Sequence, residues 1–165
     1  MSVDDHRRDE RHRGREAALQ LLYQWEIGQF KETGFDEAID LFWKIHPAPE
    51  SRQVFATRLA CGTTRQLGTI DPLIETHAEN WRLSRMAVID RLIMRMAIYE
   101  FEYQDTPAPV VIDEALELAK TFSGDQAVAF INGVLDSVRR ALLEHEVVAK
   151  EPRTTNSGLG NGNRD

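Results

Sequence analysis

Apolar residues recur at helical spacing along most of this chain, most clearly between residues 109 and 142. Two apolar stripes there are separated by a glycine. The first stripe comprises Val111, Ala115, Leu118, Ala119 and Phe122, and the second comprises Ala127, Ile131, Val134, Leu135, Val138 and Leu142. Positions three, four and seven residues apart share one face of an α-helix. The pattern therefore predicts a pair of helices joined by a tight turn.

Three residues define the ends of this predicted hairpin. Pro109 suits a first helical turn, where its missing N–H costs nothing. Gly124 can end the first helix in the left-handed conformation, and Asp125 can cap the second. Each of these residues favours the end or the start of a helix, so together they predict where the turn lies.

The segment FINGVLD, residues 130–136, has a glycine where helices rarely accept one. Gly133 costs roughly 1 kcal/mol relative to alanine in a helix interior. One interpretation is that Gly133 lets a neighbouring helix approach closely. Another places Asn132 or Phe130 at a binding surface. The two interpretations are compatible.

The rest of the chain also has a helical pattern, and no segment keeps the period-two alternation of a strand. We expect helices over about residues 10–28, 35–45, 51–67, 71–80 and 84–103. Ser84 is the expected N-cap of the last, with Leu83 and Val88 as a hydrophobic staple. This helix is apolar on nearly every side and should be the central element. Glu100 falls on its apolar stripe, so we expect a buried, hydrogen-bonded carboxylate.

These elements predict an all-α fold, a compact single-domain bundle of about seven helices over residues 10–148. The chain has 165 residues, of which 42% are hydrophobic, enough for one core. We expect a flexible arm over residues 1–9 and a disordered tail over residues 149–165, which is rich in glycine and asparagine. The single Cys61 excludes an intramolecular disulfide and is expected to be a buried thiol. We find no signal peptide and no apolar run of about 18 residues, so the expected location is the cytoplasm, away from membranes.

Charge is distributed unevenly along the chain. The net charge is −7, yet five of the arginines lie within the first 15 residues. Between Phe101 and Phe130, six acids stand against the single base Lys120. A basic end on an acidic body suggests one surface for an anion and another for a basic partner. Charged faces are also commonly just solvated.

The first predicted helix carries a stripe with the chemistry of single-stranded RNA recognition. Arg8, His12 and Arg15 align with Leu19 and Tyr23, beside a core-directed stripe through Ala18, Leu21, Leu22 and Trp25. Arginine offers planar donors to phosphates and base edges, and tyrosine offers a ring for an unstacked base. The same arginine run can also be read as a solvated arm.

Several ordered motifs resemble those of the transcription antitermination factor NusB family. They are RGREAALQLLYQWE at residues 13–26, RMAIYEF at 95–101, and IDEALELAKTFSG followed by INGVLD at 112–136. The resemblance covers about residues 11–143 and is weakest at 30–54. It implies an all-helical RNA-binding fold that contacts the boxA element of leader RNA.

The resemblance also implies roles for individual residues at the RNA surface. Arg11, Arg13 and Arg15 match the arginine-rich motif of the family, Tyr23 matches the aromatic of its LY pair, and Phe130 would lie near the same surface. Position 12 is histidine where arginine is frequent, which would lower affinity or make it dependent on pH. Gln126 and Ala129 stand where the family often has an acid and a base.

The resemblance further implies protein partners. The family forms a heterodimer with the ribosomal protein NusE and joins other Nus factors on RNA polymerase, and Asp90 matches an acidic position facing NusE. No cofactor or metal is expected, because the five histidines never take ligand spacing, and we find no catalytic motif. A related domain precedes the catalytic domain of some ribosomal RNA cytosine methyltransferases, but we expect none here. Two alternatives remain open, a purely protein-binding helical adaptor and a homodimer that covers the RNA surface.

Overall fold

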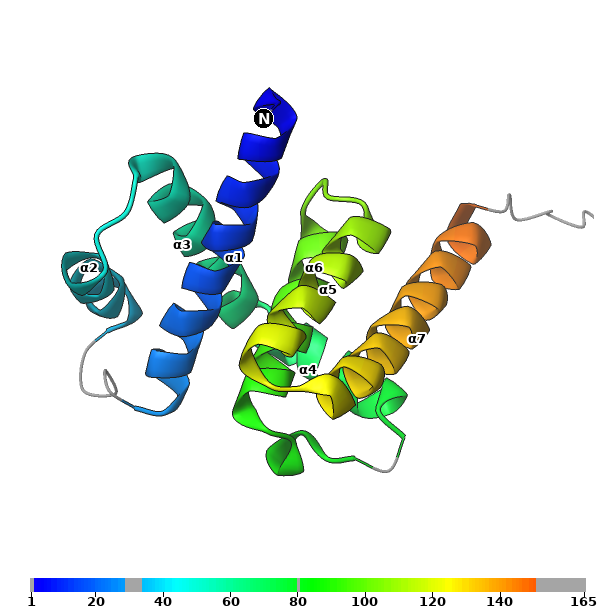
Figure 1. Ribbon diagram of the computed structural model, residues 1–165. Coiled ribbons are helices and arrows are strands. Elements are labelled where there is room, and N and C mark those ends of the chain that lie inside the picture. Colours follow the sequence, from blue (N-terminus) through cyan, green and yellow to red (C-terminus); the bar gives the residue numbers. More distant parts are fainter. Residues whose placement is uncertain (1, 29–33, 80, 151–165) are drawn as a thin grey trace, which may run out of the picture.

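The computed structural model describes residues 2–28, 34–79 and 81–150, and this part of the chain is all helical (Figure 1). The elements in chain order are α1 (Val3–Glu26), α2 (Phe35–Ile45), α3 (Glu50–Arg65), α4 (Leu67–His77), the 3₁₀ turn η1 (Leu83–Arg85), α5 (Val88–Tyr103), α6 (Ala108–Phe122) and α7 (Asp125–Lys150). The predicted all-α bundle of about seven helices is confirmed. The predicted tail lies outside the described residues from position 151 onward.

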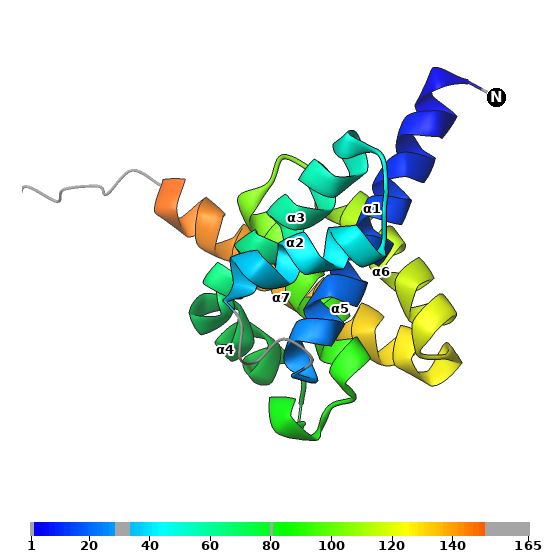
Figure 2. The same cartoon turned by 90° about the vertical axis from the view of Figure 1, so that its left-hand side faces the viewer.

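Helix α5 is the centre of the molecule, as its pattern predicts. Every residue from Leu92 to Glu100 is buried. The helix packs against α1, α3, α4, α6 and α7 (Figures 1 and 2). A helix enclosed by five others has no solvent-facing stripe, which explains its apolar composition on all sides.

The two arginines of α5 are paired with carboxylates of other helices. Arg95 donates to both carboxylate oxygens of Asp71 on α4, at 2.7 and 2.9 Å. Arg91 donates to Glu26 on α1 at 2.6 Å. Buried charges are tolerated only when they are paired in this way. These pairs therefore fix the positions of α1 and α4 on α5.

Two glycines allow close helix contacts, and neither is the one that the sequence suggested. A Cβ atom on Gly14 of α1 would lie 2.5 Å from Cδ1 of Phe55 on α3. A Cβ atom on Gly62 of α3 would overlap the ring of Tyr99 on α5. In contrast, Gly133 is exposed and a Cβ atom there would meet nothing within 4 Å. The prediction that Gly133 permits a close helix approach is wrong.

Several helix boundaries differ from those that the sequence predicted. Helix α1 begins at Val3 rather than near Glu10, because Ser2 and Asp5 form a capping box. Residues 3–9, which we expected as an arm, are thus helical. Ser84 is not an N-cap, because it lies within η1 and α5 begins only at Val88. Helix α4 begins at Leu67, ahead of the predicted position 71.

The turn between α6 and α7 follows the prediction in most respects. Gly124 has φ of 139°, a value that favours glycine, and its N–H donates to the carbonyl of Ala119 at 2.9 Å. Asp125 is the first residue of α7 rather than its cap, so its carboxylate lies at the positive end of the helix dipole. Phe122, expected on the buried stripe, is 38% exposed.

Candidate nucleic-acid interface

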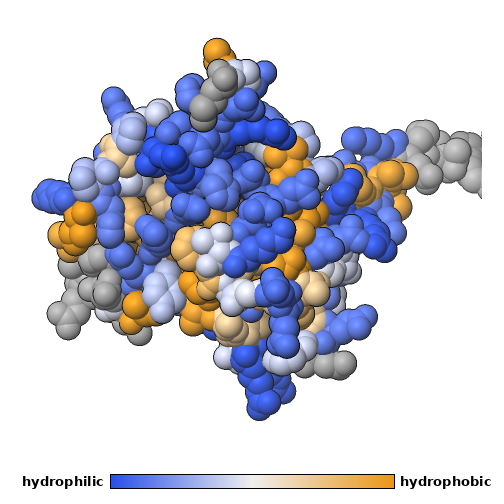
Figure 3. Space-filling view, viewed as in Figure 1, coloured by the Kyte–Doolittle hydropathy of each residue, from blue (hydrophilic) through white to orange (hydrophobic). Residues whose placement is uncertain are grey.

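The N-terminal half of α1 projects beyond the body of the molecule (Figures 1 and 2). Arg7, Arg8 and Arg11 are exposed on this part of the helix. Arg11 follows Arg7 by four positions and Arg8 by three, so their side chains share one side of α1. We call these three residues the arginine face. Hydrophilic side chains gather over this end of the molecule in Figure 3.

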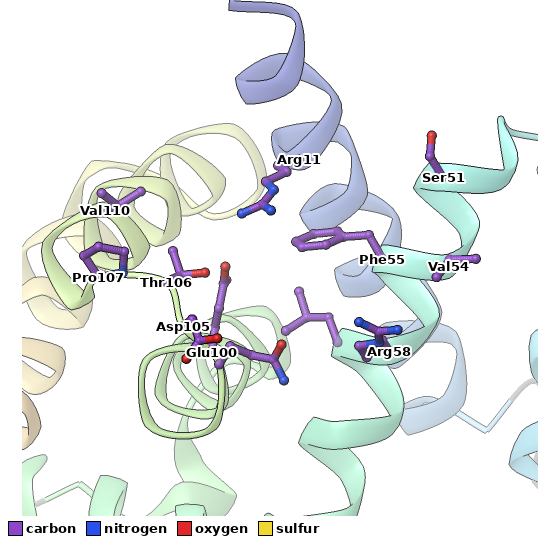
Figure 4. A pocket seen from close by; sticks show the side chains of 12 residues that line it. Arg11, Ser51, Val54, Phe55, Arg58, Glu100, Asp105, Thr106, Pro107 and Val110 are labelled. Carbon is purple, nitrogen blue, oxygen red and sulfur yellow. The ribbon is translucent and has the colours of Figure 1, made fainter. Parts of the chain in front are cut away.

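Three hollows adjoin one another at Arg11. The largest, about 660 Å³, lies between α1 and α3 and includes Arg7, Arg11 and Arg52. A second, about 520 Å³, lies between α1 and α6 and includes Arg7, Arg8 and Arg11. The third, about 560 Å³, lies between α1, α3 and the loop from α5 to α6, and includes Phe55; we call it the Phe55 cavity (Figure 4). Arg11 is the residue common to all three.

Phe55 of α3 connects the arginines of α1 to each other. The guanidinium carbon of Arg11 lies 5.8 Å from the centre of the Phe55 ring, and that of Arg15 lies 5.5 Å from it. Both separations are within the range of cation–π attraction. The ring reaches this position because Gly14 offers no side chain to obstruct it. Phe55 therefore limits the freedom of two arginines of α1, the exposed Arg11 and the buried Arg15.

Arg15 forms the buried floor of this region. Its side chain is 5% exposed, and both it and Glu100 are among the buried charged residues. Nε of Arg15 donates to Glu100 Oε2 at 2.9 Å, and Nη2 donates to Oε1. Nη1 lies 3.7 Å from Oε2 of Glu114 on α6. The two-bond pairing confirms the prediction of a hydrogen-bonded structural carboxylate at Glu100, and it fixes the plane of the Arg15 guanidinium group.

His12 is held between two carboxylates. Its Nδ1 lies 2.7 Å from Glu114 Oε2, and its Nε2 lies 3.2 Å from Glu16 Oε1. Partial burial, the largest single effect, lowers the pKa of His12, but the hydrogen bond and charge of Glu114, aided by Glu16, outweigh it and raise the pKa above its usual 6.5. The protonated ring is therefore favoured here.

The remaining predicted residues of α1 lie away from the arginine face. Arg13 pairs with Asp9 at 3.1 Å on an exposed part of the helix, two positions from Arg11 and so on a different side. Tyr23 is 37% exposed and lies about 18 Å along the helix axis from Arg11. Leu19, between Arg15 and Tyr23 on the predicted stripe, is buried. The stripe is therefore interrupted at its centre by the core.

Phe130 and Asp90 lie on other helices. Phe130 of α7 is half-buried and packs edge-on against Trp81, with ring centres 6.1 Å apart. Trp81 itself is 55% exposed. Asp90, in the first turn of α5, accepts a hydrogen bond of 2.6 Å from the Ser123 hydroxyl at the end of α6. These residues are not brought into contact with the arginine face.

Helix α3 contributes residues to this region that the sequence pattern did not indicate. Phe55 and Arg58 line the Phe55 cavity, and Arg52 donates twice to Glu10 of α1, at 2.8 and 3.2 Å. The hydrogen bond and charge of Arg52 lower the pKa of Glu10. No local pattern marks these residues, because the pairing of Arg52 with Glu10 joins positions 42 apart in sequence. Residues 30–54, where the resemblance to the family motifs is weakest, include Arg52 and end beside Phe55.

Two negative findings apply to the described residues. Within them, no helix is both long and apolar enough to cross a membrane. In the same part of the chain, no three histidine, cysteine, aspartate or glutamate side chains group in a way that could hold a metal ion.

Cys61 is half-buried rather than fully buried, and burial raises the pKa of its thiol.

Comparison with known proteins identifies the family. A model described as the NusB family matches residues 12–140. The chain is 43% identical to the transcription antitermination protein NusB of Solibacter usitatus, over 81% of this chain and 91% of that protein. It is 45% identical to the protein of the same name from Koribacter versatilis, over 80% of this chain and 90% of that protein.

Solved structures share the fold. T. maritima NusB superposes with a TM-score of 0.70 at 31% identity, over 79% of this chain and 90% of that one. A chain of the crystal structure of antitermination factors NusB and NusE with double-stranded RNA gives a TM-score of 0.71 at 21% identity, over 81% of this chain and 98% of that one. The family match, the close relatives and the shared helical fold lead to one conclusion: this chain belongs to the NusB family.

Proposed function

We propose that this protein is a transcription antitermination factor that binds single-stranded boxA-type leader RNA together with the ribosomal protein NusE. The observation that carries the proposal is the arginine face beside Phe55, three exposed arginines on one side of α1 in a chain of net charge −7. The relatives named transcription antitermination protein NusB support it, as does the shared fold of a solved complex of NusB, NusE and RNA. The role has no chemical step and consists of joining RNA, NusE, other Nus factors and RNA polymerase.

Each arginine of α1 has a distinct part in this proposal. Arg7, Arg8 and Arg11 are exposed and contact phosphates or base edges. Arg15 is held by Glu100 and is buried, so it supports the surface indirectly by positioning the Phe55 ring. His12 adds charge when it is protonated, and Arg13 contacts the strand only if the RNA wraps around α1. Tyr23 and Phe130 are rings on which bases further along the strand can stack.

The proposed NusE surface lies in the acidic second half of the chain. Asp90 at the start of α5 and Ser123 at the end of α6 bring these two helix ends together. Ribosomal proteins are basic, so an acidic face favours their association. A homodimer would compete for surface with these partners.

Titration of fluorescein-labelled boxA-type RNA, followed by fluorescence anisotropy with and without NusE, tests the proposal. Replacing Arg7, Arg8 and Arg11 with alanine should weaken binding, and the slope of log K against log salt should fall by about 0.7 for each phosphate that the variant no longer neutralises. Arg140→Ala is the matched control, since Arg140 is an exposed arginine of α7 that pairs with a carboxylate four positions away, as Arg13 does on α1, and this variant should leave affinity and slope unchanged.

Two results would contradict parts of the proposal. Unchanged affinity and slope in the triple variant would show that the arginine face is not the RNA surface. Tight NusE binding without any gain in RNA affinity would favour the protein-binding adaptor instead. Sedimentation over a range of protein concentrations separates the monomer from a homodimer.

A further inference from the structure

The Phe55 cavity is a built concavity beside the arginine face. Its volume is about 560 Å³, within the range of roughly 300–1,000 Å³ that is typical of small-ligand sites. Three elements form it: α1 contributes Arg11, α3 contributes Phe55 and Arg58, and the loop from α5 into α6 contributes Thr106 (Figure 4). The cavity is therefore formed only when the fold brings these three elements together.

Apolar residues line two flanks of the cavity, which is partly open to solvent (Figure 4). Leu59 and Phe55 line it from α3, and Pro107 and Val110 line it from the start of α6. Val110 is 41% exposed. The guanidinium carbons of Arg11 and Arg15 lie 5.8 and 5.5 Å from the centre of the Phe55 ring, and the ring approaches α1 closely at Gly14. These contacts with α1 restrain the ring, which forms an aromatic wall of the cavity. A flat apolar group can lie against such a wall with little loss of side-chain entropy.

The end of α5 and the loop after it add hydrogen-bond acceptors to the cavity lining. The amide of Gln104 donates to the hydroxyl of Tyr99 at 3.1 Å, which orients the amide and leaves its carbonyl oxygen as an acceptor. Asp105 is exposed beside it, and its carboxylate lines the same cavity. Glu100 is already committed to Arg15 and is not available to a ligand. Carboxylate and carbonyl oxygens accept hydrogen bonds from the exocyclic amino groups of bases.

Arginines gather around the mouth of the cavity. Arg11 stands there, and the two neighbouring hollows that share it carry Arg7, Arg8 and Arg52, together with Asp4, Asp5, Glu10 and Glu114. Arg52 is paired with Glu10, so the arginine face is the part that can follow a phosphate chain. A strand whose phosphates follow these arginines would pass directly over the opening. Unstacked bases of single-stranded RNA are commonly splayed out, stacked on aromatic rings or guanidinium planes and bonded along their edges. The cavity offers the Phe55 ring and the Arg11 guanidinium group for stacking, and Asp105 and Gln104 for hydrogen bonds to a base edge.

We propose that the Phe55 cavity receives one unstacked nucleobase of the bound RNA, and that it favours a base with an exocyclic amino group over uracil. This inference rests on the proposed RNA-binding function and adds a specific subsite to it. The base lies against Phe55 and under Arg11, its amino group faces Asp105 and Gln104, and its phosphate stays with the arginine face outside.

Abasic scanning of the RNA, combined with a cavity-filling variant, tests the subsite. A boxA-type RNA is made with an abasic ribose at each position in turn, and affinity is measured by anisotropy in the presence of NusE. Stacking of one base on an aromatic side chain implies that one position weakens binding roughly 5- to 150-fold when its base is removed. The variant Val110→Trp fills the mouth of the cavity, so it should bind the intact RNA roughly 5- to 150-fold more weakly than the wild-type protein does. Removing the base at the sensitive position should not weaken the binding of this variant any further.

Controls separate the cavity from other effects. Val147→Trp adds the same ring at a position of α7 that is 62% exposed and far along the chain, and it should leave affinity unchanged. Phe55→Leu removes the aromatic wall and should reproduce the weaker binding seen with Val110→Trp. The salt slope should stay constant in both cavity variants, because every phosphate-neutralising arginine is still present. Circular dichroism confirms that each variant is folded.

Base identity at the sensitive position gives the second measurement. Cytosine there should bind more tightly than uracil, and Asp105→Asn should reduce the difference. Equal binding of the two bases would contradict the preference for an amino group.

The outcomes distinguish this inference from the proposed function. Normal RNA binding with no abasic position coupled to Val110→Trp would overturn the base subsite while leaving the RNA-binding role intact. Failure of the wild-type protein to bind the RNA, with or without NusE, would overturn both.

Discussion

The pair formed by Arg15 and Glu100 shows how one contact decides the role of a residue. Both side chains are nearly inaccessible and make two hydrogen bonds to each other. Removing one member of a buried pair leaves the other as an uncompensated charge, which costs far more than the pair contributes in net terms. Arg15 is thus a structural residue beneath the RNA surface that we propose, whereas Arg11, one turn earlier, is exposed.

Glu100→Gln should therefore destabilise the protein strongly. We expect the free energy of unfolding to fall by about 3 kcal/mol, because Arg15 stays buried and keeps only the more distant carboxylate of Glu114, 3.7 Å away, to offset its charge. Urea denaturation followed by circular dichroism measures this. The double variant with Arg15→Met and Glu100→Met should be destabilised much less, since no unpaired charge remains. Greater destabilisation of the double variant than of Glu100→Gln would contradict this account.

His12 predicts a pH dependence with a definite sign. Its pKa in the folded protein is raised above 6.5 by Glu114 and Glu16 against the opposing effect of burial, so folding favours the protonated ring. The stabilisation is complete below about pH 6.5 and is lost as the pH rises through the folded pKa. His12→Gln should therefore reduce the free energy of unfolding more at about pH 6 than at about pH 9.

The corresponding NMR titration measures the pKa of His12 directly. His145→Gln, at an exposed position of α7, is the control for the general effect of losing an imidazole. A titration midpoint of His12 below 6.5 would show that burial outweighs the two carboxylates.

At the scale of elements, the surroundings of two glycines show where helices approach each other closely and where they do not. Gly62 of α3 lies against the ring of Tyr99, whereas Gly133 of α7 faces open space. The sequence alone favoured Gly133 as the contact, because it interrupts a strong helical pattern. Gly62 carried no such signal, since a close approach depends on where α3 crosses α5.

The two glycines should respond to alanine in opposite directions. Gly62→Ala should destabilise by about 1–3 kcal/mol, because Tyr99 must move within a packed core. Gly133→Ala should stabilise the free protein by about 0.5–1 kcal/mol, since the new methyl group meets nothing and helix propensity improves. Thermal and urea unfolding of the two single variants measure both effects. Destabilisation by Gly133→Ala would imply a contact that the fold does not contain.

At the scale of the whole molecule, the start of α1 is an extension of the body rather than part of the core. Residues 2–8 are exposed, and the buried residues of α1 begin at Gly14. The division into residues 1–9, 10–148 and 149–165 stays a prediction. The proposed boundary after residue 9 separates Arg7 and Arg8 from the helical domain that contains Arg11 and Arg15.

Deletion of residues 1–9 tests this division. The melting temperature should change little, because no core side chain is removed. RNA affinity should fall, and the salt slope should decrease by about 0.7 for each phosphate that Arg7 and Arg8 neutralise in the intact protein. Anisotropy titration and thermal unfolding of the same variant provide both measurements. A large drop in stability would show that these residues belong to the folded unit.

The sequence by itself determined the helices, their apolar faces, the turn at Gly124 and the family, because periodicity, capping and ordered motifs are local properties of the chain. It also predicted a paired carboxylate at Glu100. Only the tertiary structure decided which arginines are available. Glu100 is 85 positions from Arg15, and Phe55 reaches α1 from another helix, so the contacts that bury Arg15 and restrain Arg11 exist only after folding. The Phe55 cavity has the same origin, since its walls come from segments that no local pattern connects.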